Sequence, residues 1–203
     1  MKLNVVETLL VNNPVRDLLM RRSVAWLHAA AGGATVGRAL EVGCGQGSGI
    51  REIARRLRPP AIDGFDLDER QVARARAHVA ALDGVPVRLW VGDAERIAAP
   101  AAAYDAVCEF AILHHVPGWR RALAEIRRVL RPGGRFFFEE LSIEFFRDVP
   151  LVSPFLRRFT VHPWDTMFDF PTFRRALDDV GLRVTALRAP FVPGWHWGVA
   201  VRA

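Results

Sequence analysis

Short apolar runs alternate with helical stretches along most of this chain, and this alternation is the feature that most limits its fold. The runs have the length of β-strands, while the segments between them repeat apolar residues at helical spacing. Strands that alternate with helices form βαβ units, so the sequence predicts an α/β domain with a parallel sheet. The predicted strands are Arg38 to Val42, Ala61 to Asp66, Val85 to Val91, Tyr104 to Glu109 and Gly134 to Glu139.

The C-terminal part of the chain breaks this alternation. Apolar spacing from Phe173 to Val180 predicts a helix, with Thr172 as its N-cap. Two strands follow, Leu182 to Leu187 and Trp195 to Val201, and the connection between them is too short for a crossover helix. We therefore expect these two strands to pair antiparallel.

The stretch ALEVGCGQGSG, residues 39–49, joins the first strand to the next helix and has glycine at every second position from Gly43. Such a turn lets a ligand approach the backbone and reach the N–H groups of the helix start. The dinucleotide fingerprint GxGxxG is not satisfied, because Ser48 or Ile50 occupies the third glycine position in either register. The loop also follows an acid within the strand, Glu41, which indicates a different ligand.

The segment Leu40 to Gly47 resembles motif I of class I S-adenosylmethionine-dependent methyltransferases. Other motifs of that family follow in order, so that the resemblance covers residues 36–140. Gly64 to Asp68 resembles the family's second strand and its acid. Gly92 to Ala94 resembles the third-strand motif, and Tyr104 to Val107 the fourth strand. The later blocks Ile112 to Val116 and Leu130 to Phe136 are similar to the type 11, ubiquinone- and menaquinone-methyltransferase-like branch.

The resemblance implies a Rossmann-like fold with helices on both faces of a seven-stranded sheet. The sheet would be mostly parallel, in the strand order 3-2-1-4-5-7-6, with an antiparallel last strand. We expect a single methyltransferase domain over residues 1–203. Residues 1–35 would form an N-terminal helical cover, and residues 141–171 an inserted aromatic lid.

The implied cofactor is S-adenosylmethionine, with S-adenosylhomocysteine as product. By the resemblance, Asp66 would accept the ribose hydroxyls, Asp93 the adenine amino group, and Glu41 would act at the amino-acid end or order the loop. Two of these have a purely structural alternative, since Glu41 could bond the loop backbone and Asp93 could close a turn. The predicted cofactor residues are Glu41, Gly43, Cys44, Gly45, Gly47, Asp66, Leu67, Asp93, Ala94 and Glu109.

The sulfonium of this cofactor already activates the methyl group, so the protein mainly has to hold an acceptor in line behind it. Neither a metal nor a catalytic triad is required. A general base would lie where the strands end, and Glu109 and His115 are the predicted catalytic residues. Glu139 and Glu140 also end a strand, but neighbours on a strand alternate faces, so both cannot enter one crevice.

Residues 141–171 hold seven of the 20 aromatic residues of the chain, interrupted by prolines. Prolines at this density argue against one long helix, and a connection this long is usually functional. An aromatic lid would favour a small, lipophilic acceptor, such as a quinone-like ring or a lipid head group. The structural alternative is a second core layer over the sheet edge.

Three other functions compete with this prediction. The net charge of +6 would suit a nucleic-acid methyltransferase, but the arginines recur at helical spacing among glutamates, as on solvated faces. A module that binds S-adenosylmethionine without turnover is compatible with all the motifs. A nicotinamide oxidoreductase is disfavoured by the glycine register.

The composition indicates a cytoplasmic protein, because no apolar run approaches the ~20 residues that span a bilayer. Only Cys44 and Cys108 are present, which predicts neither a disulfide framework nor a zinc site. We expect a small-molecule partner and no nucleic acid. Peripheral membrane contact stays an open alternative.

Overall fold

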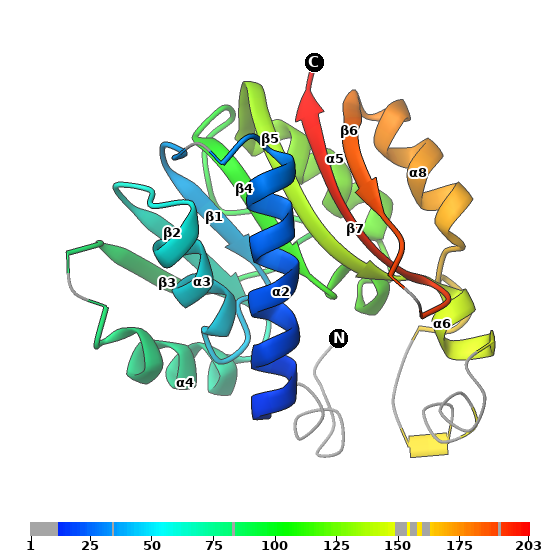
Figure 1. Ribbon diagram of the computed structural model, residues 1–203, viewed down its shortest axis with the longest axis horizontal. Coiled ribbons are helices and arrows are strands. Elements are labelled where there is room, and N and C mark those ends of the chain that lie inside the picture. Colours follow the sequence, from blue (N-terminus) through cyan, green and yellow to red (C-terminus); the bar gives the residue numbers. More distant parts are fainter. Residues whose placement is uncertain are drawn as a thin grey trace.

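The computed structural model describes residues 12–33, 35–82, 84–148, 154, 158–159, 163–190 and 192–203. Within this part of the chain, seven strands form one sheet in the order β3-β2-β1-β4-β5-β7-β6 (Figure 1). This order confirms the prediction. The strands are β1 (Ala39–Val42), β2 (Ile62–Asp66), β3 (Val87–Val91), β4 (Tyr104–Phe110), β5 (Leu130–Leu141), β6 (Leu182–Arg188) and β7 (Trp195–Arg202).

The strands from β1 to β5 pair in parallel, and only the C-terminal pairings are antiparallel. β1 lies between β2 and β4, and β3 and β5 extend the sheet on the two sides. β7 pairs antiparallel with both β5 and β6. β6 and β7 therefore pair antiparallel, as their short connection predicts, and the predicted mostly parallel sheet is confirmed.

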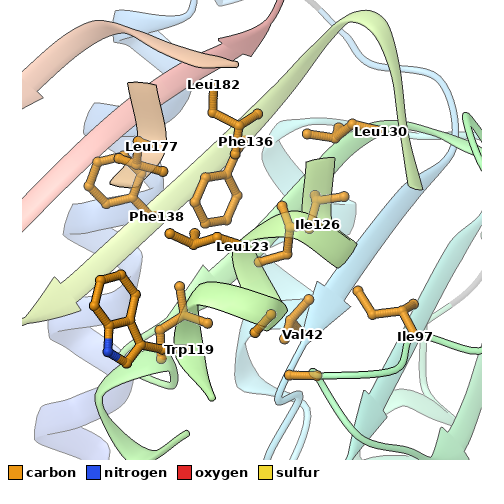
Figure 2. Packing of buried hydrophobic residues seen from close by; sticks show 14 of the residues in the cluster. Val42, Ile97, Trp119, Leu123, Ile126, Leu130, Phe136, Phe138, Leu177 and Leu182 are labelled. Carbon is orange, nitrogen blue, oxygen red and sulfur yellow. The ribbon is translucent and has the colours of Figure 1, made fainter. Parts of the chain in front are cut away.

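Helices cover both faces of the sheet (Figure 1). On one face, α2 (Pro14–Ala30), α3 (Ser48–Arg56) and α4 (Glu69–Val79) share a core with alternate residues of the central strands, such as Ala106 and Cys108. The opposite face packs against α5 (Trp119–Val129) and α8 (Phe170–Asp179). Figure 2 shows the second core, in which Leu123 and Ile126 of α5 lie beside the aromatic rings of β5.

Two boundaries differ from the prediction by three residues or more. Thr172 is not the N-cap of α8, because the Asp169 carboxylate accepts the Thr172 N–H at 2.7 Å, and the helix begins at Phe170. Pro171 fits the first turn, since its missing N–H would be unpaired there in any residue. β5 begins at Leu130, which pairs with Tyr104 before the regular register resumes at Arg135.

Two described aromatic residues of the segment 141–171, Phe146 and Phe168, are buried, whereas Phe159 is exposed. The Phe168 ring is buried and lies 4.8 Å from the rings of both Trp119 and Phe173. Phe146, in α6 (Ile143–Asp148), is buried against Trp164 at 5.7 Å. These contacts favour the core-layer alternative for this part, while Phe155 and residues 1–11 of the predicted N-terminal cover lie outside the described residues. The lid stays a prediction.

In the part of the chain that the structure describes, every helix is too short or too polar to cross a membrane. The cytoplasmic location stays a prediction.

A buried carboxylate joins four segments at the end of the sheet where the parallel strands begin. Asp63 of β2 is 2% exposed and accepts hydrogen bonds from Arg38, Arg88 and the Tyr104 hydroxyl, the last at 2.6 Å. A buried carboxylate is costly unless it is paired, and this one has a partner from β3, from β4 and from the residue before β1. The network therefore fixes the alignment of three parallel strands.

We expect Asp63→Asn to lower the free energy of unfolding by about 2 kcal/mol, because charge-assisted hydrogen bonds are replaced by weaker ones while the half-exposed arginines keep access to water. For a domain of this size that corresponds to a fall in melting temperature of about 4–8 °C. Asp179→Asn, at an exposed position of α8, is the matched control. Equal melting temperatures for both variants in scanning calorimetry would show that the network adds no stability.

Candidate functional site

A cavity of about 340 Å³ lies at the carboxyl ends of β1 to β4. Open parallel sheets bind ligands at this edge, and the volume is within the range of small-molecule sites. Its walls come from the glycine loop, the turns after β2, β3 and β4, and the N-terminal half of α2. Among the predicted cofactor residues, Gly47 and Glu109 lie outside the lining and the other eight line it.

The glycine loop adopts the backbone that its sequence predicts. Gly43, Gly45 and Gly47 all have positive φ, a region that favours glycine. A Cβ atom on Gly45 would meet nothing within 4 Å, so this backbone faces the open cavity. Gly47, the N-cap of α3, is needed for a different reason, because a Cβ there would press on Ala75 and Val79 of α4.

Asp66 closes the loop from the end of β2. Its Oδ2 accepts the Gly45 N–H and its Oδ1 the Asp68 N–H, each at 2.9 Å. Burial raises the pKa of Asp66 above its ordinary value, and the two amide bonds oppose this shift. The carboxylate thus already shapes the loop, while its side chain lines the cavity.

Glu41, in β1, lies deep in the same wall and is 1% exposed. It accepts the Ile50 N–H, and a Cβ on Gly49 would collide with its Oε1. Its Oε2 is buried without a hydrogen-bond partner. Burial raises the pKa of Glu41 well above 4.5, the Asp66 charge raises it further, and the Arg16 charge lowers it.

The turns after β2 and β3 complete the wall. Asp93 accepts the Glu95 N–H at 2.9 Å, so it closes a turn, and its side chain also lines the cavity. Ala94 and Cys44 are buried beside the space, and Leu67 is partly exposed at its rim. Burial raises the pKa of the Cys44 thiol, which therefore stays neutral.

Of the two predicted catalytic residues, only His115 lines the cavity. It belongs to the short 3-10 helix η1 (Leu113–His115), in which its ring centroid lies 4.2 Å from that of His114. Glu140 holds this helix in place. Its carboxylate accepts the Leu113 N–H at 2.8 Å, and its Oε1 lies 2.5 Å from His114 Nδ1. The position of His115 is therefore fixed from the end of β5.

Glu109 lies behind the cavity wall, fully buried, and accepts the Ile112 N–H at 3.1 Å. Burial is the main cause that raises its pKa well above 4.5, and the nearby Glu140 carboxylate adds to it. Glu109 therefore keeps its proton to a higher pH than an exposed glutamate does.

The sequence does not identify Arg16 as a site residue, because it is one arginine among many. It extends from α2 to the ends of β4 and β5, with Nη1 2.6 Å from Glu139 Oε1 and Nη2 3.3 Å from the Phe110 carbonyl oxygen. Arg16 also lines the cavity. Glu139 and Glu140 point to opposite faces of the sheet, as strand alternation requires, because Glu140 meets η1 instead. No local signal links Arg16 to Glu139, which lies 123 positions later.

Among the described residues, histidine, cysteine and acidic side chains form no group of three or more that could hold a metal ion.

Glu109→Gln is expected to stabilise the protein at alkaline pH, since glutamine resembles the protonated acid. A raised pKa in the folded state contributes stability below the ordinary glutamate pKa, and this contribution is lost as the pH rises toward the folded value. In scanning calorimetry the variant should melt about 2–4 °C above the unaltered chain at pH 8, with a smaller difference at pH 5.

Glu125→Gln is the matched control of opposite sign, because a hydrogen bond from Arg128 lowers the pKa of Glu125 and favours its charged form. This variant should melt below the unaltered chain at pH 8. If Glu109→Gln lowers the melting temperature equally at pH 5 and pH 8, Glu109 does not keep its proton to a higher pH than an exposed glutamate does.

The matching family model and two relatives of this chain are all methyltransferases. Residues 39–134 match the family model described as "Methyltransferase domain". The chain is 32% identical, over 85% of its length, to a fatty-acid O-methyltransferase of Mycolicibacterium smegmatis, of which it covers 54%. It is 38% identical, over 50% of its length, to a phthiotriol/phenolphthiotriol dimycocerosates methyltransferase of Mycobacterium tuberculosis, of which it covers 37%. The chain thus spans about half or less of these relatives.

Solved structures share the fold. An S-adenosylmethionine-dependent methyltransferase from Aquifex aeolicus superimposes with a TM-score of 0.76 at 17% identity, over the full length of both chains. Geranyl diphosphate C-methyltransferase from Streptomyces coelicolor, solved with S-adenosylhomocysteine, gives a TM-score of 0.72 at 15% identity. The alignment covers 95% of this chain and 84% of that one.

Proposed function

We propose that the chain is a class I S-adenosylmethionine-dependent methyltransferase and that it transfers a methyl group to a small apolar or aromatic acceptor; the family model over residues 39–134 and the similar relatives support this. The observation that carries this proposal is the cavity at the strand ends, where the open backbone of Gly45 and the carboxylates of Glu41 and Asp66 face one space. When bound, S-adenosylmethionine supplies an activated methyl group. Membership of the type 11 branch stays a prediction.

Two carboxylates of the cavity wall fit an adenosine group. Each Asp66 oxygen accepts one amide N–H, and a carboxylate oxygen can accept a second hydrogen bond, so Asp66 could take both ribose hydroxyls. Asp93 uses one oxygen in its turn, which leaves the other for an adenine amino group, with the Ala94 N–H beside it. The missing side chain of Gly45 leaves the approach open.

The apolar side chains that border the same cavity fit an apolar acceptor. Met20, Phe110, Ile112 and Val116 line it, together with His115. Apolar walls exclude water and hold an acceptor at near-attack distance, and such positioning can supply several kcal/mol of the barrier. The names of two relatives, which act on a fatty acid and on phthiotriol dimycocerosates, support a lipophilic acceptor.

His115 would take the proton of a hydroxyl acceptor, because it is the predicted base that borders the cavity. Glu109 would act on the wall behind it through the Ile112 amide. A carboxylate acceptor carries no proton at neutral pH, so it would need no base.

The cofactor half of the proposal is tested by calorimetric titration. S-adenosylmethionine and S-adenosylhomocysteine should bind in the micromolar range, while NAD should give no heat. Asp66→Ala should weaken binding by at least about tenfold, because the loss of charge-assisted hydrogen bonds costs more than ~1.4 kcal/mol. Asp179→Ala is the control, and a thermal melt of each variant checks its fold. Binding of NAD instead would contradict the cofactor assignment.

The acceptor half is tested by transfer from labelled S-adenosylmethionine to fatty acids, simple phenols and polar amino acids. We expect transfer to the lipophilic compounds. His115→Ala should lower kcat for phenols by about 10²-fold and leave fatty-acid turnover much less affected, since only the phenol must lose a proton. Transfer to polar metabolites alone would contradict the acceptor class, and binding without transfer to any compound would favour the non-catalytic module.

A further inference from the structure

A buried glutamate and histidine are in contact directly behind the cavity wall. Glu140, at the end of β5, is 1% exposed, and its Oε1 lies 2.5 Å from Nδ1 of His114, which is 2% exposed. Neither residue lines the cavity. The same carboxylate accepts the Leu113 N–H, so it holds two consecutive residues of η1. The third residue of that helix is His115, which does line the cavity.

The His114 ring connects the Glu140 carboxylate to His115. Its centroid lies 4.2 Å from the centroid of the His115 ring and 5.5 Å from that of the Phe146 ring in α6. A ring that is bonded at Nδ1 and packed against two other rings has little freedom to turn. The carboxylate and the two imidazole rings therefore form a short series that runs from β5 to the cavity.

Titratable groups from three other elements surround the Glu140 carboxylate. Glu109 of β4 keeps its proton, because burial and the Glu140 charge both raise the pKa of Glu109. His196 pairs with Glu140 across β5 and β7, and burial lowers the pKa of His196, while the charges of Glu144 in α6 and of Glu140 oppose that shift. A protonated Glu109 and a neutral His196 leave the Glu140 charge available to the rings of η1.

A base that takes a proton becomes a cation, and a nearby carboxylate favours that form. Two imidazole rings 4.2 Å apart repel each other when both are charged, so Glu140 and the two rings favour a single added proton. We propose that Glu140 and His114 are positioning residues for His115, and that the Glu140 charge stabilises the imidazolium that His115 forms when it takes the proton of a hydroxyl acceptor. This deepens the proposed function and rests on it, because it requires such an acceptor in the cavity.

The step is a proton transfer that accompanies methyl transfer. His115 takes the proton of the acceptor hydroxyl, and the acceptor oxygen forms a bond to the methyl carbon as the bond between that carbon and the sulfonium sulfur breaks. S-adenosylhomocysteine leaves with a neutral sulfur, and the imidazolium then gives its proton to water. Glu140 and His114 do not touch the acceptor, so they act on this step only through His115.

The test compares a phenol, which must lose a proton, with a fatty acid, which is already ionised at pH 8. Glu140→Gln keeps an oxygen for the Leu113 N–H and removes the charge. Its kcat for the phenol should fall about tenfold, because the imidazolium loses a stabilising charge. Its kcat for the fatty acid should stay within about twofold of that of the unaltered chain.

The pH profile of phenol transfer gives the second readout. The neutral base is the active form, so kcat rises as the pH rises through the pKa of the base. Removal of the Glu140 charge should move the midpoint of this acidic limb about one pH unit lower. Both chains keep the other acidic and basic side chains that border the cavity with His115, which are Arg16, Glu41, Asp66, Asp68, Asp93 and Glu95.

His114→Phe is the second variant, because it keeps a ring beside His115 and removes the contact with Glu140. It should lower kcat for the phenol about as much as Glu140→Gln does. Glu52→Gln is the matched control, since Glu52 is a buried glutamate of α3 that pairs with Arg56 and does not line the cavity. It should leave both acceptors within about twofold. Thermal melts and titration with S-adenosylhomocysteine check the fold and the cavity of each variant.

Equal losses for the phenol and the fatty acid in Glu140→Gln, with an unmoved acidic limb, would overturn the proposal, because Glu140 would then only support the fold. Unchanged phenol transfer in this variant would overturn it as well. An unaltered chain that methylates fatty acids but no phenol would overturn the positioning role and leave the proposed function standing. An unaltered chain that methylates neither compound would overturn both.

Discussion

The Asp66 carboxylate ties the ends of two parallel strands into one loop system. It accepts N–H groups from Gly45, after β1, and from Asp68, before α4. Glu41 adds a bond within the turn after β1, where it takes the Ile50 N–H at the start of α3. Backbone N–H groups at strand–helix turns need partners, and here acids supply them. The same two carboxylates line the cavity, so the groups that shape the loop also define its chemistry.

Strand alternation then decides how the remaining buried acids are used. At the end of β5, Glu139 faces α2 and pairs with Arg16, whereas Glu140 faces η1 and binds the Leu113 amide. A buried carboxylate is tolerated only with such partners. Two walls of the cavity, α2 and η1, are consequently attached to neighbouring positions of one strand. A change at either position should therefore act on the cavity from a different side.

Local patterns in the sequence predicted most of the fold and part of the site. The strand order followed from the family resemblance and is confirmed. The predicted start of α8 was wrong because Asp169 and Thr172, both residues that can cap a helix, lie close together. Asp169 has the geometry to bond the third N–H of the turn. Arg16 could not be predicted, since its partner is distant in sequence and is reached only through tertiary packing.

The central claim is that the cavity at the carboxyl ends of β1 to β4 binds S-adenosylmethionine. A crystal structure of the protein with S-adenosylhomocysteine tests it most directly. We expect the ribose hydroxyls within hydrogen-bond distance of Asp66 and the adenine beside Asp93, with the homocysteine end directed toward Glu41. A ligand bound elsewhere on the protein, or a ribose that faces away from Asp66, would contradict the claim.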